Sequence, residues 1–346
     1  MACSNVEYIK ACLQAGISVL LQGPPGSGKT SIGHTVAEQM AMDFMSIVAT
    51  VKEPVDFSGL PRFDSDGNAV FVPFGFAKRV YNATEPTLVL IDDLGQSAPS
   101  VQAAAMQWLQ ERELNGNQVS EHVRFLIATN RPKDRAGVGQ VISPIRSRCV
   151  QLEQVTRCTC DGRNLCDWHV WALEHDISPI VQGFARFKPS CMAEYEEENV
   201  DHASVVCSPR ALEYLSRLEV NGLPEPALPL LEGVIGTSYA SDYLAFRVMY
   251  GQLPLIDDIV KDPVNTPIPS GSDKVGKLYA LSTMLAAQVS AKNASAVLTF
   301  VARMPIEYST ACVMTGLRKY PGLPSHREFV DWATQSAPHL LGGDDS

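Results

Sequence analysis

Residues 17–40 read ISVLLQGPPGSGKTSIGHTVAEQM, and this stretch decides the fold. It begins with an apolar run typical of a buried strand and breaks at the glycine- and proline-rich residues 23–28. A helical pattern then continues from Lys29 to about Met42. Because a strand, a glycine loop and a helix in this order open a parallel α/β sheet, we expect the first strand of such a sheet at residues 17–21.

The loop inside this stretch fits the pattern G-x-x-x-x-G-K-[ST] and has the strand-to-helix context that the pattern requires. The glycines let backbone N–H groups surround phosphate oxygens, and the N-terminus of the following helix adds a favourable field. We expect Lys29, exposed at the mouth of the loop, to reach the β and γ phosphates of ATP, and the Thr30 hydroxyl to hold Mg²⁺. The predicted ATP-binding residues are Gly23, Pro24, Pro25, Gly26, Ser27, Gly28, Lys29, Thr30 and Ser31.

Asp92 and Asp93 end a second apolar strand, whose residues 88–91 are Leu, Val, Leu and Ile. Such a strand delivers its last residues to the carboxyl edge of the sheet, where open α/β sheets bind their ligands. We therefore predict that Asp92 binds the Mg²⁺ shell and that Asp93 orients and polarises the attacking water. The alternative is a pair of solvated loop carboxylates.

Two more apolar runs, residues 44–49 and 123–128, predict further buried strands, and residues 99–112 predict a helix. Four buried strands separated by helices are typical of a doubly wound parallel sheet. Residues 62–74 differ, because two short strands flank a turn-rich tetrapeptide there. They predict a hairpin inserted between the α/β elements.

Beyond residue 152 the buried-strand runs become few and helical periodicity predominates. We predict an α/β nucleotide-binding domain over residues 1–155, followed by an all-helical lid over residues 156–250. Prolines and a glycine between residues 263 and 271 indicate a linker. The predicted remainder, residues 251–346, is a helical C-terminal extension.

The formal net charge is −10, with 28 Lys plus Arg and 38 Asp plus Glu. This balance disfavours nucleic acid as the main partner, because binding to a phosphate backbone needs a basic face. No segment reaches the 18 or so unbroken apolar residues of a membrane span, and the apolar run near the N-terminus ends in a loop rather than a cleavage site. We expect a cytoplasmic protein.

Nine cysteines are scattered along the chain, and without a secretory signal they fit reduced thiols better than a disulfide framework. One group is dense enough to raise a zinc site. Its spacing is not the paired C-x-x-C of structural zinc sites, so we interpret it as unliganded thiols, with zinc as the alternative. The group consists of Cys158, Cys160, Cys166 and His169.

The two motifs described so far are shared by kinases, GTPases and helicases, and three later features narrow the class. Asn130 follows the strand at residues 123–128 and can hold the lytic water or the γ-phosphate. Arg146 and Arg148 close the α/β domain beyond its last predicted strand. Arg210 stands at the start of a predicted helix in the second domain.

In their order along the chain, these features resemble the Walker A, Walker B, sensor 1, arginine finger and sensor 2 motifs of AAA+ ATPases. The match covers most of residues 17–220. The sequence DFSGL at residues 56–60, followed by the hairpin at 62–74, resembles the MoxR branch, whose members carry a β-hairpin in the second helix. Residues 92–96 and 243–254 resemble a bacterial and phage subgroup of MoxR-like ATPases.

The resemblance implies a role for each late feature: Asn130 is sensor 1, and Arg148 is the finger that reaches a neighbour's γ-phosphate, with Arg146 as a competing finger. It implies that Arg210 is sensor 2 for the nucleotide of its own subunit. Two positions depart from the family pattern. Asp93 stands where a glutamate is usual, and the finger motif ends in Cys149 where an aromatic residue is commoner.

The resemblance further implies hydrolysis of Mg-ATP at the interfaces of a homo-oligomeric ring, a hexamer, that remodels a protein client. Such relatives often work with a protein bearing a von Willebrand factor A domain, so a partner of that kind is implied. Two alternatives stay open. One is a DNA-directed clamp-loader or helicase-loader ATPase, suggested by residues 147–149, and the other is a nucleotide-gated scaffold with little hydrolysis, which Asp93 keeps open.

Overall fold

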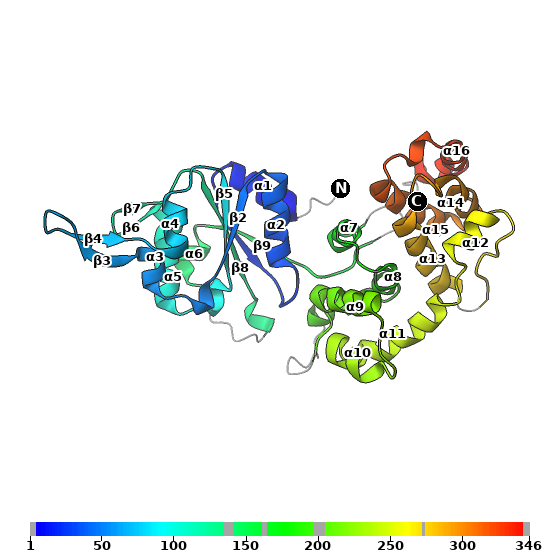
Figure 1. Cartoon of the computed structure of the whole chain (residues 1–346), viewed down its shortest axis with the longest axis horizontal. Coiled ribbons are helices and arrows are strands. Elements are labelled where there is room, and N and C mark those ends of the chain that lie inside the picture. Colours follow the sequence, from blue (N-terminus) through cyan, green and yellow to red (C-terminus); the bar gives the residue numbers. More distant parts are fainter. Residues whose placement is uncertain (1–4, 135–140, 161–164, 197–204, 272–273, 342–346) are drawn as a thin grey trace. The chain divides into compact units, whose positions relative to one another are not determined.

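The computed structural model describes residues 5–134, 141–160, 165–196, 205–271 and 274–341. The chain divides into two compact units, residues 1–156 and residues 157–346. The first unit combines a sheet with helices, and the second is helical (Figure 1). Among the described residues, no helix is both long and apolar enough to cross a membrane.

A five-stranded parallel sheet forms the centre of the first unit, in the order β2-β5-β8-β1-β9. Because all five strands run the same way, their carboxyl ends meet at one edge of the sheet. The predicted parallel α/β fold is confirmed, with one strand more than the four expected. The strands are β1 (Val19–Gln22), β2 (Asp43–Val48), β5 (Thr87–Asp92), β8 (Val123–Thr129) and β9 (Val150–Glu153).

Helices cover both faces of this sheet (Figure 1). Side chains alternate along a strand, so Val19 and Leu21 pack in one layer while Leu20 packs in the other. Burial on both faces explains why the strands read as continuous apolar runs. One layer holds α1 (Asn5–Gln14) and α2 (Lys29–Gln39), and the other holds α3 (Pro54–Ser58), α4 (Gly75–Tyr81), α5 (Pro99–Gln110) and α6 (Ser143–Arg146).

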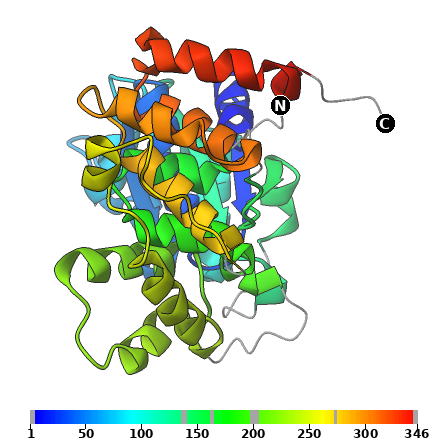
Figure 2. The same ribbon diagram turned by 90° about the vertical axis from the view of Figure 1, so that its right-hand side faces the viewer.

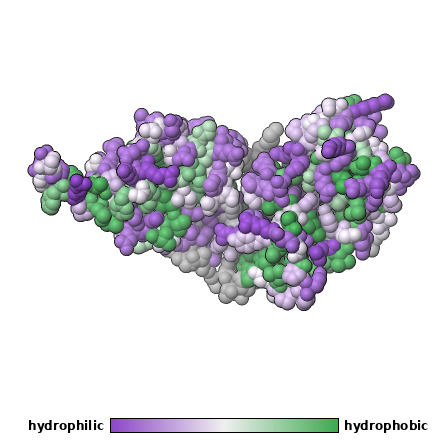
Figure 3. All heavy atoms as spheres, in the orientation of Figure 1, coloured by the Kyte–Doolittle hydropathy of each residue, from purple (hydrophilic) through white to green (hydrophobic). Residues whose placement is uncertain are grey.

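A hairpin projects from the first unit, formed by β3 (Leu60–Phe63) and β4 (Ala69–Val72) in a separate antiparallel sheet (Figure 1). Gly59 opens it with φ of 84°, and a Cβ at this position would lie 2.5 Å from the carbonyl oxygen of Val72. Only glycine fits both the backbone angle and this close approach. The hairpin exposes apolar side chains (Figure 3), and Phe63 is 73% exposed.

A second, shorter hairpin was not predicted from the sequence. It consists of β6 (Glu113–Leu114) and β7 (Asn117–Gln118). The Asn117 side-chain amide donates a hydrogen bond of 3.0 Å to the carbonyl oxygen of Phe71 in β4. The shorter hairpin therefore braces the projecting one.

One core of buried residues runs through the second unit from Cys166 to Trp332. Its last helix, red in Figure 2, packs on α14 and α15. Further division of this unit into a lid over residues 156–250 and an extension over 251–346 remains a prediction. The helices are α7 (Asp167–Glu174), α8 (Pro179–Phe187), α9 (Pro209–Asn221), α10 (Leu228–Ile235), α11 (Thr237–Tyr250), α12 (Ile256–Lys261), α13 (Lys274–Gln288), α14 (Ala294–Val301), α15 (Ile306–Lys319) and α16 (Arg327–Leu341).

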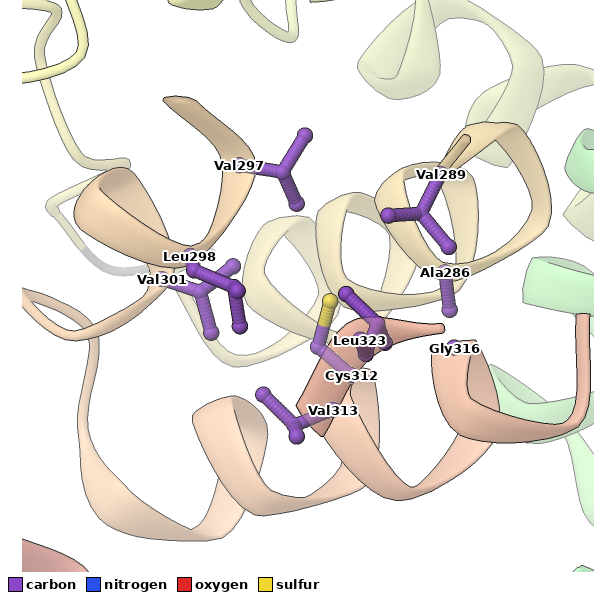
Figure 4. Close-up of a pocket in the computed structure, with 9 residues that line it drawn as sticks. All are labelled: Ala286, Val289, Val297, Leu298, Val301, Cys312, Val313, Gly316 and Leu323. Atoms are coloured by element: carbon purple, nitrogen blue, oxygen red, sulfur yellow. The ribbon is translucent and has the colours of Figure 1, made fainter. Parts of the chain in front are cut away.

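A small pocket lies inside this helical core, among α13, α14 and α15 (Figure 4). Its volume is about 10 Å³ and its lining is apolar, including Cys312 and Leu323. A space of that size holds at most one water molecule. The pocket is a packing gap and not a ligand site.

Candidate functional site

The loop between β1 and α2 has the backbone that a phosphate site needs. Gly26 and Gly28 have φ of 73° and 85°, in the left-handed region that favours glycine. At Gly23 a Cβ would lie 2.9 Å from Cβ of Gln154, so a larger residue would clash there. The helix α2 begins directly after the loop, at Lys29, and no side chain caps it. Its first N–H groups therefore face the loop as potential anion donors.

Lys29 is buried at the base of this loop, and its side chain is only 7% exposed. Its Nζ donates to the carbonyl oxygens of Gly23 (2.9 Å) and Pro24 (3.0 Å) and to Oδ1 of Asn130 (2.8 Å). The expectation of an exposed lysine is wrong, because the loop folds around the ammonium group and its own carbonyls bind it. A phosphate oxygen would compete with Asn130 for the third donor of this group.

The residues predicted to hold Mg²⁺ are adjacent. The Thr30 hydroxyl donates to Oδ2 of Asp92 at 2.8 Å. Mg²⁺ prefers six oxygen ligands at 2.0–2.1 Å, which puts neighbouring ligand oxygens about 2.9 Å apart. The donor types and their separation thus fit an Mg²⁺ ion held by these two side chains. Such an ion would neutralise charge on the β- and γ-phosphate oxygens.

Asp93 adopts φ of 55°, a left-handed conformation that is rare outside glycine and that clusters at functional sites. Its Oδ1 accepts a hydrogen bond of 2.8 Å from the Gln96 side-chain amide. Gln96 in turn accepts one of 3.2 Å from the hydroxyl of Thr129, the last residue of β8. Gly95 permits this contact, because a Cβ there would lie 2.3 Å from the Thr129 hydroxyl. Two hydrogen bonds, Gln96 to Asp93 and Thr129 to Gln96, thus connect the ends of β5 and β8. The sequence motifs did not reveal this connection.

An ion pair in the turn after β8, next to Asn130, was also not predicted from the sequence. The next residue, Arg131, is buried and makes a bidentate contact with buried Asp134, the shortest N–O distance being 2.7 Å. Arg131 also contacts Glu153 at the end of β9, at 2.9 Å. A buried pair of this kind is rigid because both partners are already desolvated and bonded. It holds the turn after β8 next to β9, and with it the amide that contacts Lys29.

Two smaller features complete this edge of the sheet. The hydroxyl of Ser27 is buried and has no hydrogen-bond partner among the described residues. A buried polar atom without a partner calls for an explanation, and a phosphate oxygen in the loop would supply one. Ser31, in the first turn of α2, is exposed. The carboxyl edge therefore gathers Lys29, Thr30, Asp92, Asp93 and Asn130, drawn from β5, α2 and the turn after β8.

The two candidate finger arginines lie elsewhere, at the amino end of the sheet. Arg146 ends α6 and Arg148 follows it, both exposed, and both precede the strand β9. Arg148 donates to the carbonyl oxygen of Pro144 at 2.7 Å. Our expectation that they lie beyond the last strand is wrong, because β9 is a short edge strand that the sequence pattern did not reveal. Burial raises the pKa of the Cys149 thiol to about 11, so it adds no charge beside Arg148 near neutral pH.

Arg210 belongs to the second unit. It is exposed in the first turn of α9, where Ser208 caps the helix by accepting from the N–H of Ala211 at 3.3 Å. This cap explains the Ser-Pro-Arg start of the helix. The role of Arg210 as sensor 2 remains a prediction.

Comparison with known proteins finds a family similarity within the first unit. The family model "ATPase family associated with various cellular activities (AAA)" matches residues 19–156. The chain is 32% identical over 167 residues to protein CdcH of Halobacterium salinarum, covering 45% of this chain and 20% of CdcH. It is 26% identical over 136 residues to the 26S proteasome regulatory subunit 10B of Dictyostelium discoideum, covering 36% of this chain and 32% of that subunit.

The chain thus spans a third or less of the length of these curated relatives. Among solved structures, the Thermotoga maritima RuvB Holliday junction branch migration motor aligns with a TM-score of 0.37 and 15% identity, over 75% of each chain. NtrX from Brucella abortus in complex with ADP aligns with a TM-score of 0.39 and 14% identity, over 99% of this chain and 69% of NtrX. Scores this low support no argument about function.

The family-model match falls on the unit whose carboxyl edge holds the glycine loop, the adjacent threonine and aspartate, and the buried lysine. Such a domain is expected to bind a nucleotide. Residues 19–156 therefore resemble an ATPase domain of the AAA family, and this match covers the first unit.

Proposed function

We propose that the chain is a MoxR-like AAA+ ATPase that binds and hydrolyses Mg-ATP at the subunit interfaces of a ring, a hexamer, and uses this to remodel a protein client. The nucleotide would lie at the carboxyl edge of the sheet, with Gly23 to Ser31 around its phosphates. Lys29 would exchange its bond to Asn130 for a γ-phosphate oxygen. Asn130, released from Lys29, would then hold the attacking water.

The observation that carries this proposal is the separation of the loop from the exposed arginines. Strand β9 runs parallel to β1, with Val150 beside Val19. The loop begins at Gly23, four residues further along β1, which is about 13 Å at 3.3 Å per residue. Arg148 precedes Val150 and thus lies at the opposite edge from its own loop. An arginine placed there is too far from its own loop to reach it, which supports a role at the loop of another subunit.

In a ring, Arg148 of one subunit would approach the γ-phosphate held by its neighbour and stabilise the charge of the transition state. Asp93 would accept hydrogen bonds from the attacking water and orient it. Arg210 would act as sensor 2, as the motif resemblance implies. Each of these roles follows the order of the AAA+ motifs in this sequence.

A nucleotide-gated scaffold is the second candidate, and the contact of Asp93 with Gln96 favours it. A carboxylate already bonded to an amide at 2.8 Å is a weaker acceptor for water, and it is one methylene shorter than the usual glutamate. A scaffold of this kind would hydrolyse ATP slowly, and binding of the nucleotide, not its hydrolysis, would control the assembly of the subunits. Phosphate release per assembled subunit distinguishes the two candidates.

The client is proposed to be a protein, because the projecting hairpin exposes apolar residues such as Phe63 and Leu60. A partner with a von Willebrand factor A domain is the form suggested by the MoxR resemblance. The name of one relative, the Holliday junction branch migration complex subunit RuvB of Salinibacter ruber, suggests DNA instead; it is 36% identical over 69 residues, 19% of this chain and 20% of RuvB. The net charge of −10 opposes that alternative.

The dependence of ATP hydrolysis on protein concentration tests the proposal. If the site needs an arginine from a neighbour, phosphate release per subunit rises with protein concentration and reaches a plateau when native mass spectrometry shows the ring. Added duplex or single-stranded DNA leaves the plateau unchanged. A monomer that hydrolyses ATP at a constant rate per subunit would exclude the ring, and strong stimulation by DNA would favour the DNA-directed alternative.

A further inference from the structure

Four potential metal ligands converge where the chain enters the second unit. Cys158 and Cys160 lie ahead of α7, Cys166 is its N-cap residue and His169 is in its first turn. Their ligand atoms all lie within 4.8 Å of one another. His169 is 2% exposed and Cys166 is buried, so the cluster is shielded from solvent.

Hydrogen bonding alone does not account for this convergence. The Nδ1 atom of His169 lies 3.1 Å from Sγ of Cys166, 3.3 Å from that of Cys160 and 3.8 Å from that of Cys158. A bare imidazole nitrogen has one lone pair and accepts one hydrogen bond. Three sulfur atoms around one nitrogen therefore need another centre to hold them together.

The other ring nitrogen indicates which form of the imidazole is present. Nε2 of His169 lies 3.2 Å from the carbonyl oxygen of Gln182 in α8. A carbonyl oxygen only accepts hydrogen bonds, so Nε2 carries the hydrogen. In the neutral ring Nδ1 then carries no hydrogen, and its lone pair is available to a metal. Metal-bound histidines are commonly oriented in this way, by donating their second N–H to a backbone carbonyl.

The distances agree with tetrahedral zinc. With Zn–S near 2.3 Å and Zn–N near 2.0–2.1 Å, a tetrahedron has edges of about 3.8 Å between sulfurs and about 3.6 Å between sulfur and nitrogen. The Cys158–Cys166 sulfur distance is 4.0 Å, and the three sulfur–nitrogen distances bracket the second value. The N–H of Cys166 also donates to Sγ of Cys160 at 3.2 Å, a bond that stabilises a thiolate ligand.

We propose that Sγ of Cys158, Cys160 and Cys166 and Nδ1 of His169 bind one Zn²⁺ ion. Three thiolates and one imidazole are one of the common donor sets of structural zinc sites, and soft thiolate ligands disfavour Mg²⁺ and Ca²⁺. Four protein ligands close the tetrahedron and leave no position for a substrate. The ion is a structural clip that fastens the segment preceding α7 to α7 and, through His169, to α8. This inference does not rest on the proposed ATPase function.

Metal analysis of the full-length protein tests this site. Protein expressed in zinc-supplemented medium and passed over a chelating column is expected to retain about one equivalent of zinc per chain. Exchange with Co²⁺ should give the absorption bands of a tetrahedral site with thiolate ligands, a measurement that needs no variant. Less than about a fifth of an equivalent of tightly held metal, or intact mass showing a disulfide between two of these cysteines, would overturn the proposal.

Variants then assign the ligands. Cys160→Ser and Cys166→Ser should each lose most of the bound zinc, whereas Cys149→Ser, a partly buried cysteine of the first unit, should retain it. Cys158→His keeps a tetrahedral donor set and is expected to keep the metal while shifting the Co²⁺ spectrum. Chelation of the native protein should lower the unfolding temperature of the second unit. Unchanged zinc content in the Cys160→Ser, Cys166→Ser double variant would contradict the assignment.

Discussion

The two edges of the central sheet differ in how their charged residues are held. At the carboxyl edge Lys29 is buried and bonds Asn130, and the Thr30 hydroxyl bonds Asp92. At the amino edge Arg148 is exposed, and it donates to the carbonyl oxygen of Pro144 and to the hydroxyl of Ser147. A preorganised set of groups is typical of a site that binds its ligand within the chain. We propose that the exposed arginine of the same domain acts on a neighbouring subunit.

Arg148→Ala should have the largest effect on catalysis. An arginine supplied by a neighbour is worth about 10³–10⁵ in turnover, and its removal leaves the loop that binds ATP untouched. The rate of phosphate release should fall by at least about 10³, while ATP affinity changes little. Arg146→Ala is the matched control and should lose far less. The reverse ranking of the two variants would assign the finger to Arg146.

Asp93→Asn should come next. Asparagine keeps the shape of the side chain and can still accept the bond from Gln96, but it loses the charge that polarises water. Turnover should fall by about 10²–10⁴, as for loss of a general base, with ATP affinity nearly unchanged. Fluorescent-nucleotide titration and phosphate release measure the two quantities separately. Equal losses of affinity and turnover would mean that Asp93 serves binding rather than the water.

Lys29→Ala should act on affinity. A hydrogen bond to a charged group contributes about 1.5–3 kcal/mol, so loss of the phosphate contact should weaken ATP binding roughly 10- to 100-fold. Lys78→Ala, an exposed lysine of α4, should bind ATP normally. Calorimetric titration of both variants, with thermal unfolding to verify folding, provides the comparison. Wild-type affinity in the Lys29 variant would exclude the phosphate site.

The projecting hairpin should have the smallest effect on the nucleotide. Phe63→Ser replaces a side chain that is 73% exposed in a sheet separate from the central one, so ATP affinity and stability should stay within error. Client binding is where this variant should fail. Phe57→Ala is the contrast, because Phe57 is fully buried and its loss should cost about 3–5 kcal/mol of unfolding free energy. Loss of ATP affinity on Phe63→Ser would make the hairpin part of the nucleotide site.

The sequence predicted the carboxyl edge better than the amino edge, for a physical reason. The strands β1, β5 and β8 are buried on both faces, which produces apolar runs that end at motif residues. Strand β9 is at the edge of the sheet, and its four residues alternate between partly buried and exposed, so no apolar run marks it. Without β9, the arginines before it were placed beyond the sheet.

Long-range contacts between polar residues were equally invisible. Arg131 and Glu153 are 22 positions apart, and nothing in either neighbourhood indicates that they meet. The burial of Lys29 depends on how the loop carbonyls turn, which the motif does not specify. The cysteine cluster could not be predicted as a metal site for the same reason. Its spacing fits no paired C-x-x-C pattern, and His169 meets the sulfur atoms because it lies in the first turn of α7.

A mixing experiment tests most directly whether the loop of one subunit works with the arginine of its neighbour. Arg148→Ala retains an intact loop, and Lys29→Ala retains an intact arginine. With ATP held well below the weakened Kd of the Lys29 variant, each variant alone should hydrolyse ATP at a small fraction of the wild-type rate. Combined in equal amounts, they should form rings in which some interfaces join an intact loop to an intact arginine, and phosphate release should rise well above the sum of the two. If native mass spectrometry shows mixed rings and the rate stays at that sum, the arginine does not act across the interface and the account is contradicted.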